Sequence, residues 1–208
     1  MWTSRSGKEQ SLKTPLKTPL TFFSIEKATI VRWTRPTGHW KKLNVDSSSW
    51  GNPGAGGGGR VYRNEARNLI FAFQNSYGHV TNMVAEARAM IDGLTLCKDM
   101  RLSSIIVETD SRTLFDAVTS HSNSCSWRLW YVLESIHHLS QSLNLSFSHI
   151  LREGNFVVDG LAHIASNSAP NKLFLNIADL PRPVRGSMIL DKAGVGQIRH
   201  CRPKKGIS

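Results

Sequence analysis

Four carboxylates of this 208-residue chain occupy positions where an acid is not needed for solubility: Asp46, Glu86, Asp110 and Asp159. Two of them end predicted strands. Asp46 closes the alternating run 42–46, which predicts a half-buried strand, so its carboxylate would lie within a sheet. Asp110 follows the apolar run 105–107, typical of a buried parallel strand, and open α/β sheets bind ligands at the carboxyl ends of such strands.

The other two acids fall on predicted helices. Glu86 lies at the rim of an apolar stripe with 3.6-residue spacing, on a helix expected from about residue 81 to about residue 97. Asp159 lies in the first turn of a helix expected to begin near Asn155. An acid that faces inwards needs a partner, and a divalent cation shared by all four would supply one. The set therefore indicates a metal-binding cluster.

Such a cluster suits the hydrolysis of a phosphodiester. The reaction needs an activated water and something to absorb developing negative charge, and two Mg²⁺ ions about 4 Å apart do both. Taken singly, the acids have ordinary explanations: Asp46 could begin a turn, and Glu86 could be a solvated helix residue. Asp110 could cap the next helix, and Asp159 could favour its helix dipole. The four together favour metal binding.

The motifs around these acids, taken in order, resemble those of the ribonuclease H family (type 1), and more narrowly the plant ribonuclease H-like domains related to retroelement reverse transcriptases. The resemblance extends from about Trp40 to about Ala165. It rests on Lys42-Leu43-Asn44-Val45-Asp46, the glycine-rich segment 54–59, Ala85-Glu86-Ala87, Val107-Glu108-Thr109-Asp110-Ser111, and the stretch from His149 through Arg152-Glu153-Gly154-Asn155 to Asp159-Gly160-Leu161-Ala162. The chain departs from the family at Ser47, where glycine is usual.

The resemblance implies an endonuclease that cuts the RNA strand of RNA–DNA hybrids with two Mg²⁺ ions, for which Mn²⁺ can substitute. It places the four acids on the metal-ligand positions and His149 on that of an auxiliary histidine, which helps proton transfer or product release. A strand histidine bonded within the core is an equally open interpretation of His149. Selectivity would come from contacts with successive 2′-hydroxyls, and four residues near the implied groove have suitable donors: Ser48, Asn52, Asn82 and Asn155.

The order of predicted elements indicates an α/β fold: a ribonuclease H-like mixed five-stranded sheet, three antiparallel strands then two parallel, flanked by helices. The strands are expected near 42–46, 59–63, 69–73, 104–109 and 143–150, and the helices near 81–97, 112–119, 127–141 and 155–166. No Lys-Ser/Thr pair follows the glycine-rich segment, as a phosphate-binding loop requires, so we interpret it as a turn or bulge. Trp127 and Trp130, three residues apart on a predicted helix, are expected in the core.

Basic charge is concentrated at the two ends of the chain. Of the formal net charge of +11, residues 1–42 contribute +7 and residues 171–208 contribute +6, whereas residues 43–170 carry −2. We therefore predict a basic, disordered N-terminal arm (1–38), a ribonuclease H-like domain (39–168) and a basic, disordered C-terminal tail (169–208). The arms either tether the domain to phosphates or merely keep it soluble. If they tether it, residues 40–170 alone should cleave hybrid with weaker binding and a shallower salt dependence.

Cysteine usage bears on the compartment. Cys97, Cys125 and Cys201 are widely spaced, with no Cys-x-x-Cys pair, which favours a reducing intracellular environment. The apolar runs are too short for a membrane span, and the N-terminus has no apolar segment like that of a secretory signal. We expect a monomer in the nucleus or the cytoplasm, and an organelle remains an open alternative. Its expected partner is nucleic acid, and we expect no association with a membrane.

Two other functions compete with hybrid cleavage. The chain could be a catalytically weak or inactive nucleic-acid-binding domain derived from a retroelement, an alternative that Ser47 leaves open. A proofreading exonuclease is disfavoured, because that class carries an Asp-x-Glu pair on its first strand and here Ser48 stands two residues after Asp46.

Overall fold

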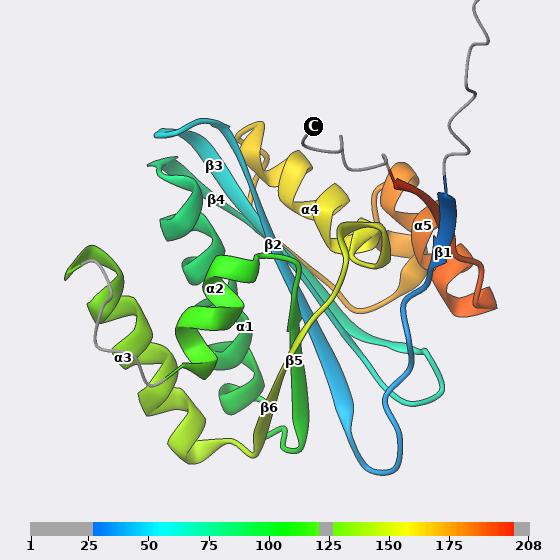
Figure 1. The fold of residues 1–208 in the computed structure, drawn as a ribbon, viewed down its shortest axis with the longest axis horizontal. Helices are drawn as coiled ribbons and strands as arrows, with labels where there is room; N and C mark the ends of the chain where they lie inside the picture. The colour runs from blue at the N-terminus through cyan, green and yellow to red at the C-terminus, as the bar shows by residue number, and fades with distance from the viewer. Residues whose placement is uncertain (1–26, 121–126, 202–208) are drawn as a thin grey trace, which may run out of the picture.

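The structure is a computed structural model that describes residues 27–120 and 127–201. Its centre is a six-stranded mixed sheet with the strand order β6-β5-β2-β3-β4-β7 (Figure 1). The strands are β2 (Lys41–Gly51), β3 (Gly54–Arg63), β4 (Leu69–Val80), β5 (Ile105–Thr109), β6 (Leu145–His149) and β7 (Lys172–Phe174). β2, β3 and β4 are antiparallel neighbours, and β5 and β6 run parallel to β2. The predicted α/β class is confirmed, with one strand more than expected.

Helices cover both faces of this sheet (Figure 1). One face carries α1 (Asn82–Asp99), α2 (Arg112–Thr119) and α3 (Trp127–Ser142), and the other carries α4 (Phe156–Ser166) and α5 (Arg182–Ala193). Two apolar cores result. The core beneath α1 includes Leu43, Tyr62, Met90 and Leu94. The core beneath α4 and α5 includes Val61, Ala72, Leu161 and Met188.

Alternation along β2 divides its side chains between these two faces. Leu43 and Val45 belong to the core beneath α1. The alternate residues of the strand point the other way: Asn44 reaches the start of α4, and Ser48 reaches its end. Asp46 lies between these two on the same face and is 3% exposed. The strand therefore presents its carboxylate towards α4.

The glycine-rich segment 54–59 is part of β3, so its interpretation as a turn is wrong, although a register shift within it shows the predicted bulge. The glycines are needed because α4 lies directly on the β3 backbone. A Cβ atom on Gly57 would overlap the backbone nitrogen of Ser166, and one on Gly59 would overlap the carbonyl oxygen of Val158. This close approach fixes the start of α4, and with it Asp159, relative to the sheet.

The region after residue 170 differs from the predicted disordered tail. It contains β7, the short 3₁₀ helix η2 (Ile177–Asp179), α5 and β8 (Gln197–Cys201). Four apolar side chains from this region are buried in the core beneath α4: Phe174, Leu180, Val184 and Met188. Pro181 and Pro183, which suggested an extended chain, instead stand at the start of α5, where proline is tolerated because its missing N–H has no intrahelical partner. The prediction of disorder is wrong for residues 172–201.

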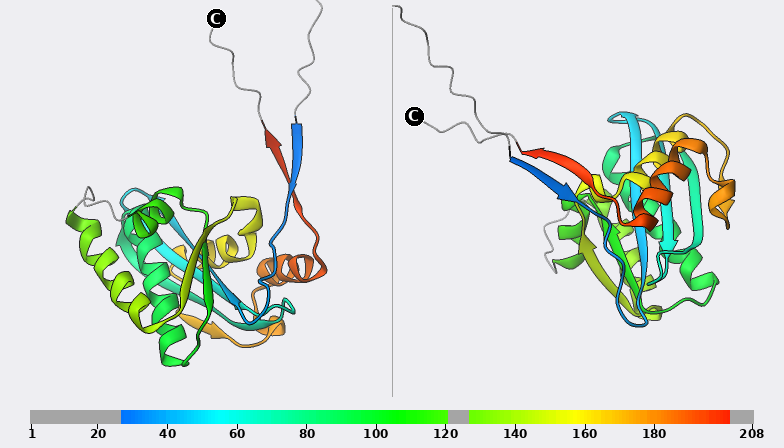
Figure 2. Two further views of the ribbon diagram at one scale, coloured as in Figure 1. Left: turned by 60° about the horizontal axis from the view of Figure 1, so that its bottom comes forward. Right: turned by 90° about the vertical axis from the view of Figure 1, so that its right-hand side faces the viewer.

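The N-terminal segment also contains structure. β1 (Lys27–Val31), within the predicted arm, pairs antiparallel with β8 to form a separate two-stranded sheet. Figure 2 shows this ribbon projecting from the body of the molecule. A salt bridge joins it to the domain, between Arg199 of β8 and Glu153 at 3.3 Å. The predictions for residues 1–26 and 202–208 lie outside the described residues.

The surface of α3 corrects a further expectation. Trp130 is 53% exposed, so its predicted core position is wrong, and α3 instead buries Ile136 and Leu139 against α1. The side chain of Trp127 lies outside the described side chains. Among the described helices, none combines the length and the apolar character that crossing a membrane requires.

Candidate active site

The sheet brings two of the predicted carboxylates together. In the parallel pairing of β2 with β5, Val45 lies opposite Thr109. The residues that follow them are Asp46 on β2 and Asp110 just after β5. Asp46 is buried within β2, and Asp110 is half-buried just beyond β5. The two acids therefore occupy neighbouring positions, as the strand patterns predicted.

The other two carboxylates approach from the helices on opposite faces. Asp159 is in the first turn of α4, and Glu86 is near the start of α1. Their nearness to the strand acids appears in the electrostatics. Burial, followed by the charges of Glu86, Asp110 and Asp159, raises the pKa of Asp46 well above its usual range. All four acids therefore share one region.

The same repulsion acts on the neighbours of Asp46. The pKa of Glu86 is raised to about 8, mainly by burial and then by the charge of Asp110. Burial is also the main cause that raises the pKa of Asp110, with a contribution from Asp159. Because like charges at short range disfavour ionisation, the cluster holds protons that isolated carboxyl groups would have released at neutral pH.

Two carboxylate oxygens of the cluster have no partner. Oδ2 of Asp46 and Oε2 of Glu86 are buried without a hydrogen bond. Buried anionic oxygens require compensation, and a hard divalent cation such as Mg²⁺, which prefers oxygen ligands, would provide it. Within residues 27–120 and 127–201, no three His, Cys, Asp or Glu side chains are arranged closely enough to hold a metal ion. The donor set fits such an ion chemically, while the side chains converge without forming a complete ligand shell.

Arg152 supplies a positive charge at the cluster. It lies in the 3₁₀ turn η1 (Arg152–Gly154), and its Nη2 atom is 2.9 Å from Oδ1 of Asp159. Its charge also opposes the rise in the pKa of Glu86 and of Asp110. Sequence analysis assigned it no role. The available signal was a cation seven residues before Asp159, in the segment that joins two predicted site residues.

Ser47, the residue that departs from the usual glycine, is integrated into the site. Its backbone N–H donates to Oδ1 of Asp46 at 2.7 Å. Its side chain opposes the rise in the pKa of Glu86. The serine thus bonds one of the four acids through its backbone and lowers the pKa of another through its side chain.

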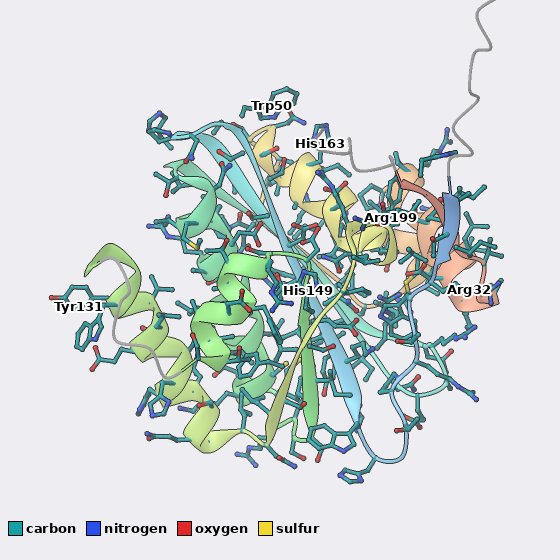
Figure 3. The ribbon with its side chains drawn as sticks, in the orientation of Figure 1. Arg32, Trp50, Tyr131, His149, His163 and Arg199 are labelled. Carbon is teal, nitrogen blue, oxygen red and sulfur yellow. The ribbon has the colours of Figure 1, made fainter. Side chains whose placement is uncertain are left out.

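His149 lies beside the cluster and is half-buried, in contrast to the enclosed core position that the alternative interpretation required. Its Nε2 atom is 3.2 Å from the backbone oxygen of Asp110, and its ring meets the edge of Phe115 with centroids 6.0 Å apart. Figure 3 shows it between α2 and the loop that leads to α4. The ring is therefore near the acids but bonded to the backbone of one of them.

Three of the four predicted nucleic-acid contacts lie where β2 turns into β3 and α1 begins. The backbone N–H of Asn82 donates to Oδ1 of Asn52 at 3.1 Å, and both residues are exposed. Ser48 is half-buried, and its hydroxyl is 3.5 Å from that of Ser166. The amide donors of Asn52 and Asn82 therefore face the solvent.

Asn155, the fourth predicted contact, does not face a groove. It is 1% exposed, and its amide nitrogen donates to the backbone oxygen of Val45 at 3.1 Å. It also opposes the rise in the pKa of Asp110. The prediction of a nucleic-acid contact fails because the close packing of α4 encloses this residue. Asn155 instead holds two segments that carry the acids.

The raised carboxyl pKa values predict how stability depends on pH in metal-free protein. Because the pKa of Glu86 rises from an ordinary 4.5 to about 8 on folding, the folded state binds more protons across that range than the unfolded state. The free energy of unfolding must then fall as pH rises from about 5 to about 8. Melting temperatures measured in EDTA should decrease across this range, and less steeply in Glu86→Gln. The control Glu134→Gln, at an exposed acid, should leave the dependence of melting temperature on pH unaltered. A melting temperature that rises between about pH 5 and about pH 8 would contradict the raised pKa of Glu86.

Comparisons with known proteins agree with the fold. A family model described as reverse transcriptase-like matches residues 44–165. A protein of Arabidopsis thaliana named as a ribonuclease H protein is 27% identical over 137 residues, which are 65% of this chain and 22% of that protein. The chain thus spans about a fifth of the length of this relative.

Solved structures resemble the chain over a similar extent. RNase H1 of the halophilic archaeon Halobacterium salinarum has 25% identity and a TM-score of 0.59, covering 62% of this chain and 98% of that one. LC11-RNase H1, isolated from compost and solved in complex with an RNA/DNA hybrid, has 27% identity and a TM-score of 0.58, with 62% and 97% covered. Each of these proteins therefore corresponds, over nearly its whole length, to about three fifths of the chain.

Proposed function

Because the chain belongs to the reverse transcriptase-like family, whose model matches residues 44–165, we propose that it hydrolyses the RNA strand of RNA–DNA hybrids. The observation that carries the proposal is the convergence of four acids whose charges act on one another, with two buried carboxylate oxygens lacking partners. The similarity to an RNase H1 solved with a hybrid supports this choice of substrate. We propose Mg²⁺ as the cofactor, two ions in number, with Mn²⁺ as a possible substitute.

The four acids Asp46, Glu86, Asp110 and Asp159 would hold these ions, which when bound supply an activated water and absorb charge on the leaving oxygen. The surrounding residues orient the acids. The Ser47 backbone N–H holds Asp46, and the Ser47 and Asn155 side chains oppose the rise in the pKa of Glu86 and of Asp110 respectively. His149, whose Nε2 atom lies beside Asp110, can accept or deliver a proton at the edge of the cluster. Asn52 and Asn82 offer exposed amide donors for 2′-hydroxyls.

One experiment tests this function. The protein is incubated with end-labelled RNA–DNA hybrid, duplex DNA or duplex RNA, each with Mg²⁺ or with EDTA. We expect cleavage of the RNA strand of the hybrid with Mg²⁺ and no cleavage in EDTA. Cleavage that persists in EDTA would exclude metal dependence, and equal cleavage of duplex DNA would exclude selectivity for RNA.

A second function, that of a catalytically weak or inactive nucleic-acid-binding domain derived from a retroelement, is favoured by one observation. Arg152 already pairs with Asp159 at 2.9 Å and so occupies a carboxylate that cleavage requires for metal. Binding of hybrid without cleavage at any Mg²⁺ concentration would support this alternative. Cleavage that appears at millimolar Mg²⁺ would show that the ion displaces the arginine.

The basic arms are proposed to tether the domain to nucleic acid. Residues 1–26 carry four basic and two acidic residues, and residues 202–208 carry three basic residues. A chain limited to residues 27–201 should cleave hybrid with weaker binding. Its slope of log affinity against log salt should be shallower by about 0.9 for each phosphate that the arms no longer neutralise. The control for chain length is a full-length variant in which Arg202, Lys204 and Lys205 become Gln. If the salt slope is unchanged in both the shortened chain and this variant, the arms serve solubility.

A further inference from the structure

A buried polar network connects the C-terminal helix to the carboxylate cluster. It passes through side chains from five parts of the fold, and we call it the Arg63 network: Trp33, Asn44, Arg63, Asn155 and Asp191. All but Asp191 are at most 2% exposed, and the Asp191 side chain is 14% exposed. Each member is hydrogen-bonded to at least one other, while Nε of Arg63 is buried without a partner. Enclosed networks of this kind restrict how their members can be arranged.

In the outer part of the network, Asp191 and Trp33 hold the buried guanidinium group of Arg63. Nη1 of Arg63 lies 2.7 Å from Oδ2 of Asp191 on α5. The guanidinium group also stacks over the ring of Trp33, 3.7 Å from its centroid. A buried charge without a partner is strongly destabilising, so Asp191 determines where the arginine can remain. The position of Arg63 therefore depends on both flanks of the domain.

The middle of the network fixes the orientation of one amide. Oδ1 of Asn44 accepts two hydrogen bonds, from Nη2 of Arg63 at 2.9 Å and from Nε1 of Trp33 at 2.8 Å. Because two donors hold this oxygen, the amide nitrogen of Asn44 must point inwards. There it donates to Oδ1 of Asn155 at 3.2 Å and to Glu108 at 2.9 Å.

The inner part of the network reaches the acids. With its own oxygen bound by Asn44, Asn155 has its amide nitrogen free to donate to the backbone oxygen of Val45, next to Asp46. The same side chain lies close enough to Asp110 to oppose the rise in the pKa of that carboxyl group. One amide therefore ties β2 to the start of α4, and so helps to place Asp46 relative to Asp159.

Resting on the proposed function, we propose that Arg63 is a positioning residue for the carboxylate cluster, and that Trp33 and Asp191 complete the divalent-cation site from outside the family-matched region. Both residues lie beyond the matched residues 44–165. Groups behind the ligands of a metal site commonly decide how well the ligands are oriented, and their removal lowers affinity by roughly 10–100-fold. The flanking segments thereby have a role in the site, in addition to covering the core.

The test compares two aspartates that partner buried arginines of the same strand. Asp191→Asn removes the partner of Arg63, and Asp92→Asn removes that of Arg60, whose bonds lead to Tyr77 and α1 and not to the Asn44 amide. Mn²⁺ affinity is measured by calorimetry without substrate, far below the melting temperature. We expect affinity to fall about tenfold in Asp191→Asn and to stay unchanged in Asp92→Asn, although both changes lower the melting temperature. Asp191→Glu should recover part of the affinity.

Two further readouts separate this proposal from the proposed function. The side-chain amide protons of Asn155, observed by NMR, should exchange faster in Asp191→Asn, and this requires neither metal nor cleavage. With hybrid, kcat should fall while KM stays constant. If wild-type protein binds Mn²⁺ but does not cleave, the proposed function fails and the positioning role stands on the other measurements.

Wild-type Mn²⁺ affinity together with unchanged Asn155 exchange in folded Asp191→Asn would overturn the proposal. Should wild-type protein bind no Mn²⁺, the cation-site claim is wrong. If Asp191→Asn does not fold, Trp33→Phe decides the question. That change keeps a ring beneath the guanidinium but removes the indole N–H that orients Asn44, and it should shift both readouts in the same direction by a smaller amount.

Discussion

Replacing Asp110 with Asn is expected to reduce cleavage of RNA–DNA hybrid on the order of a thousandfold while leaving the fold intact. The amide keeps the shape of the side chain but loses the charge that holds a divalent cation, and such ions contribute several kcal/mol to transition-state stabilisation. Without metal, the variant should melt at a higher temperature than wild type, because burial and the charge of Asp159 both disfavour the ionised form of Asp110.

The measurement pairs single-turnover cleavage rates with thermal melting in EDTA. Asp116→Asn serves as the control, because this exposed acid of α2 pairs only with Arg112, one turn away, among the salt bridges of the described residues. It should leave both quantities unchanged. A wild-type cleavage rate in Asp110→Asn would remove this carboxylate from the mechanism.

A chain that ends at residue 170 is expected not to fold cooperatively. It lacks β7 and α5, and with them the four buried side chains Phe174, Leu180, Val184 and Met188. Removing a buried apolar side chain costs about 2–5 kcal/mol, against a total stability of about 5–15 kcal/mol. Arg63 would also lack its partner Asp191. The expectation that residues 40–170 form a self-sufficient catalytic unit therefore conflicts with the packing.

Circular dichroism during heating tests this prediction. The chain ending at residue 170 should melt without a sharp transition and bind a dye that reports exposed apolar surface. A chain ending at residue 201 is the control, since it keeps every described element, and it should melt close to the full-length protein. A sharp transition at a similar temperature in the shorter chain would show that the C-terminal elements are dispensable.

The nearness of two of the acids was predictable because both have a local signature. Asp46 and Asp110 end patterned strands, and the parallel pairing of β2 with β5 then makes them neighbours. Glu108 illustrates the limit of strand alternation: it lies two residues before Asp110, yet its carboxylate is engaged by Lys42 at 2.6 Å. Only the neighbouring strand reveals that this acid is paired, in accord with its omission from the predicted ligands.

The role of Asn155 and the ordered C-terminal region were not predictable for a different reason. An asparagine has the same sequence signature whether its amide faces solvent or the core. Asn155 bonds Asn44 and Val45, and both lie more than a hundred residues earlier in the chain. The C-terminal segment has a three-residue strand and proline near its helix, which are weak local signals. Its order comes from burial against α4, which is a tertiary effect.

The ribbon of β1 and β8 should open before the rest of the domain unfolds. It pairs residue 27 with residue 201, and the entropic cost of closing a loop rises with its length, so the ribbon forms only after the domain has brought its ends together. Two strands alone are marginally stable, which makes the ribbon the first part to separate under native conditions. Its opening breaks the salt bridge of Arg199 with Glu153, the residue next to Arg152. Opening of the ribbon therefore removes one restraint on the turn that carries Arg152, the partner of Asp159.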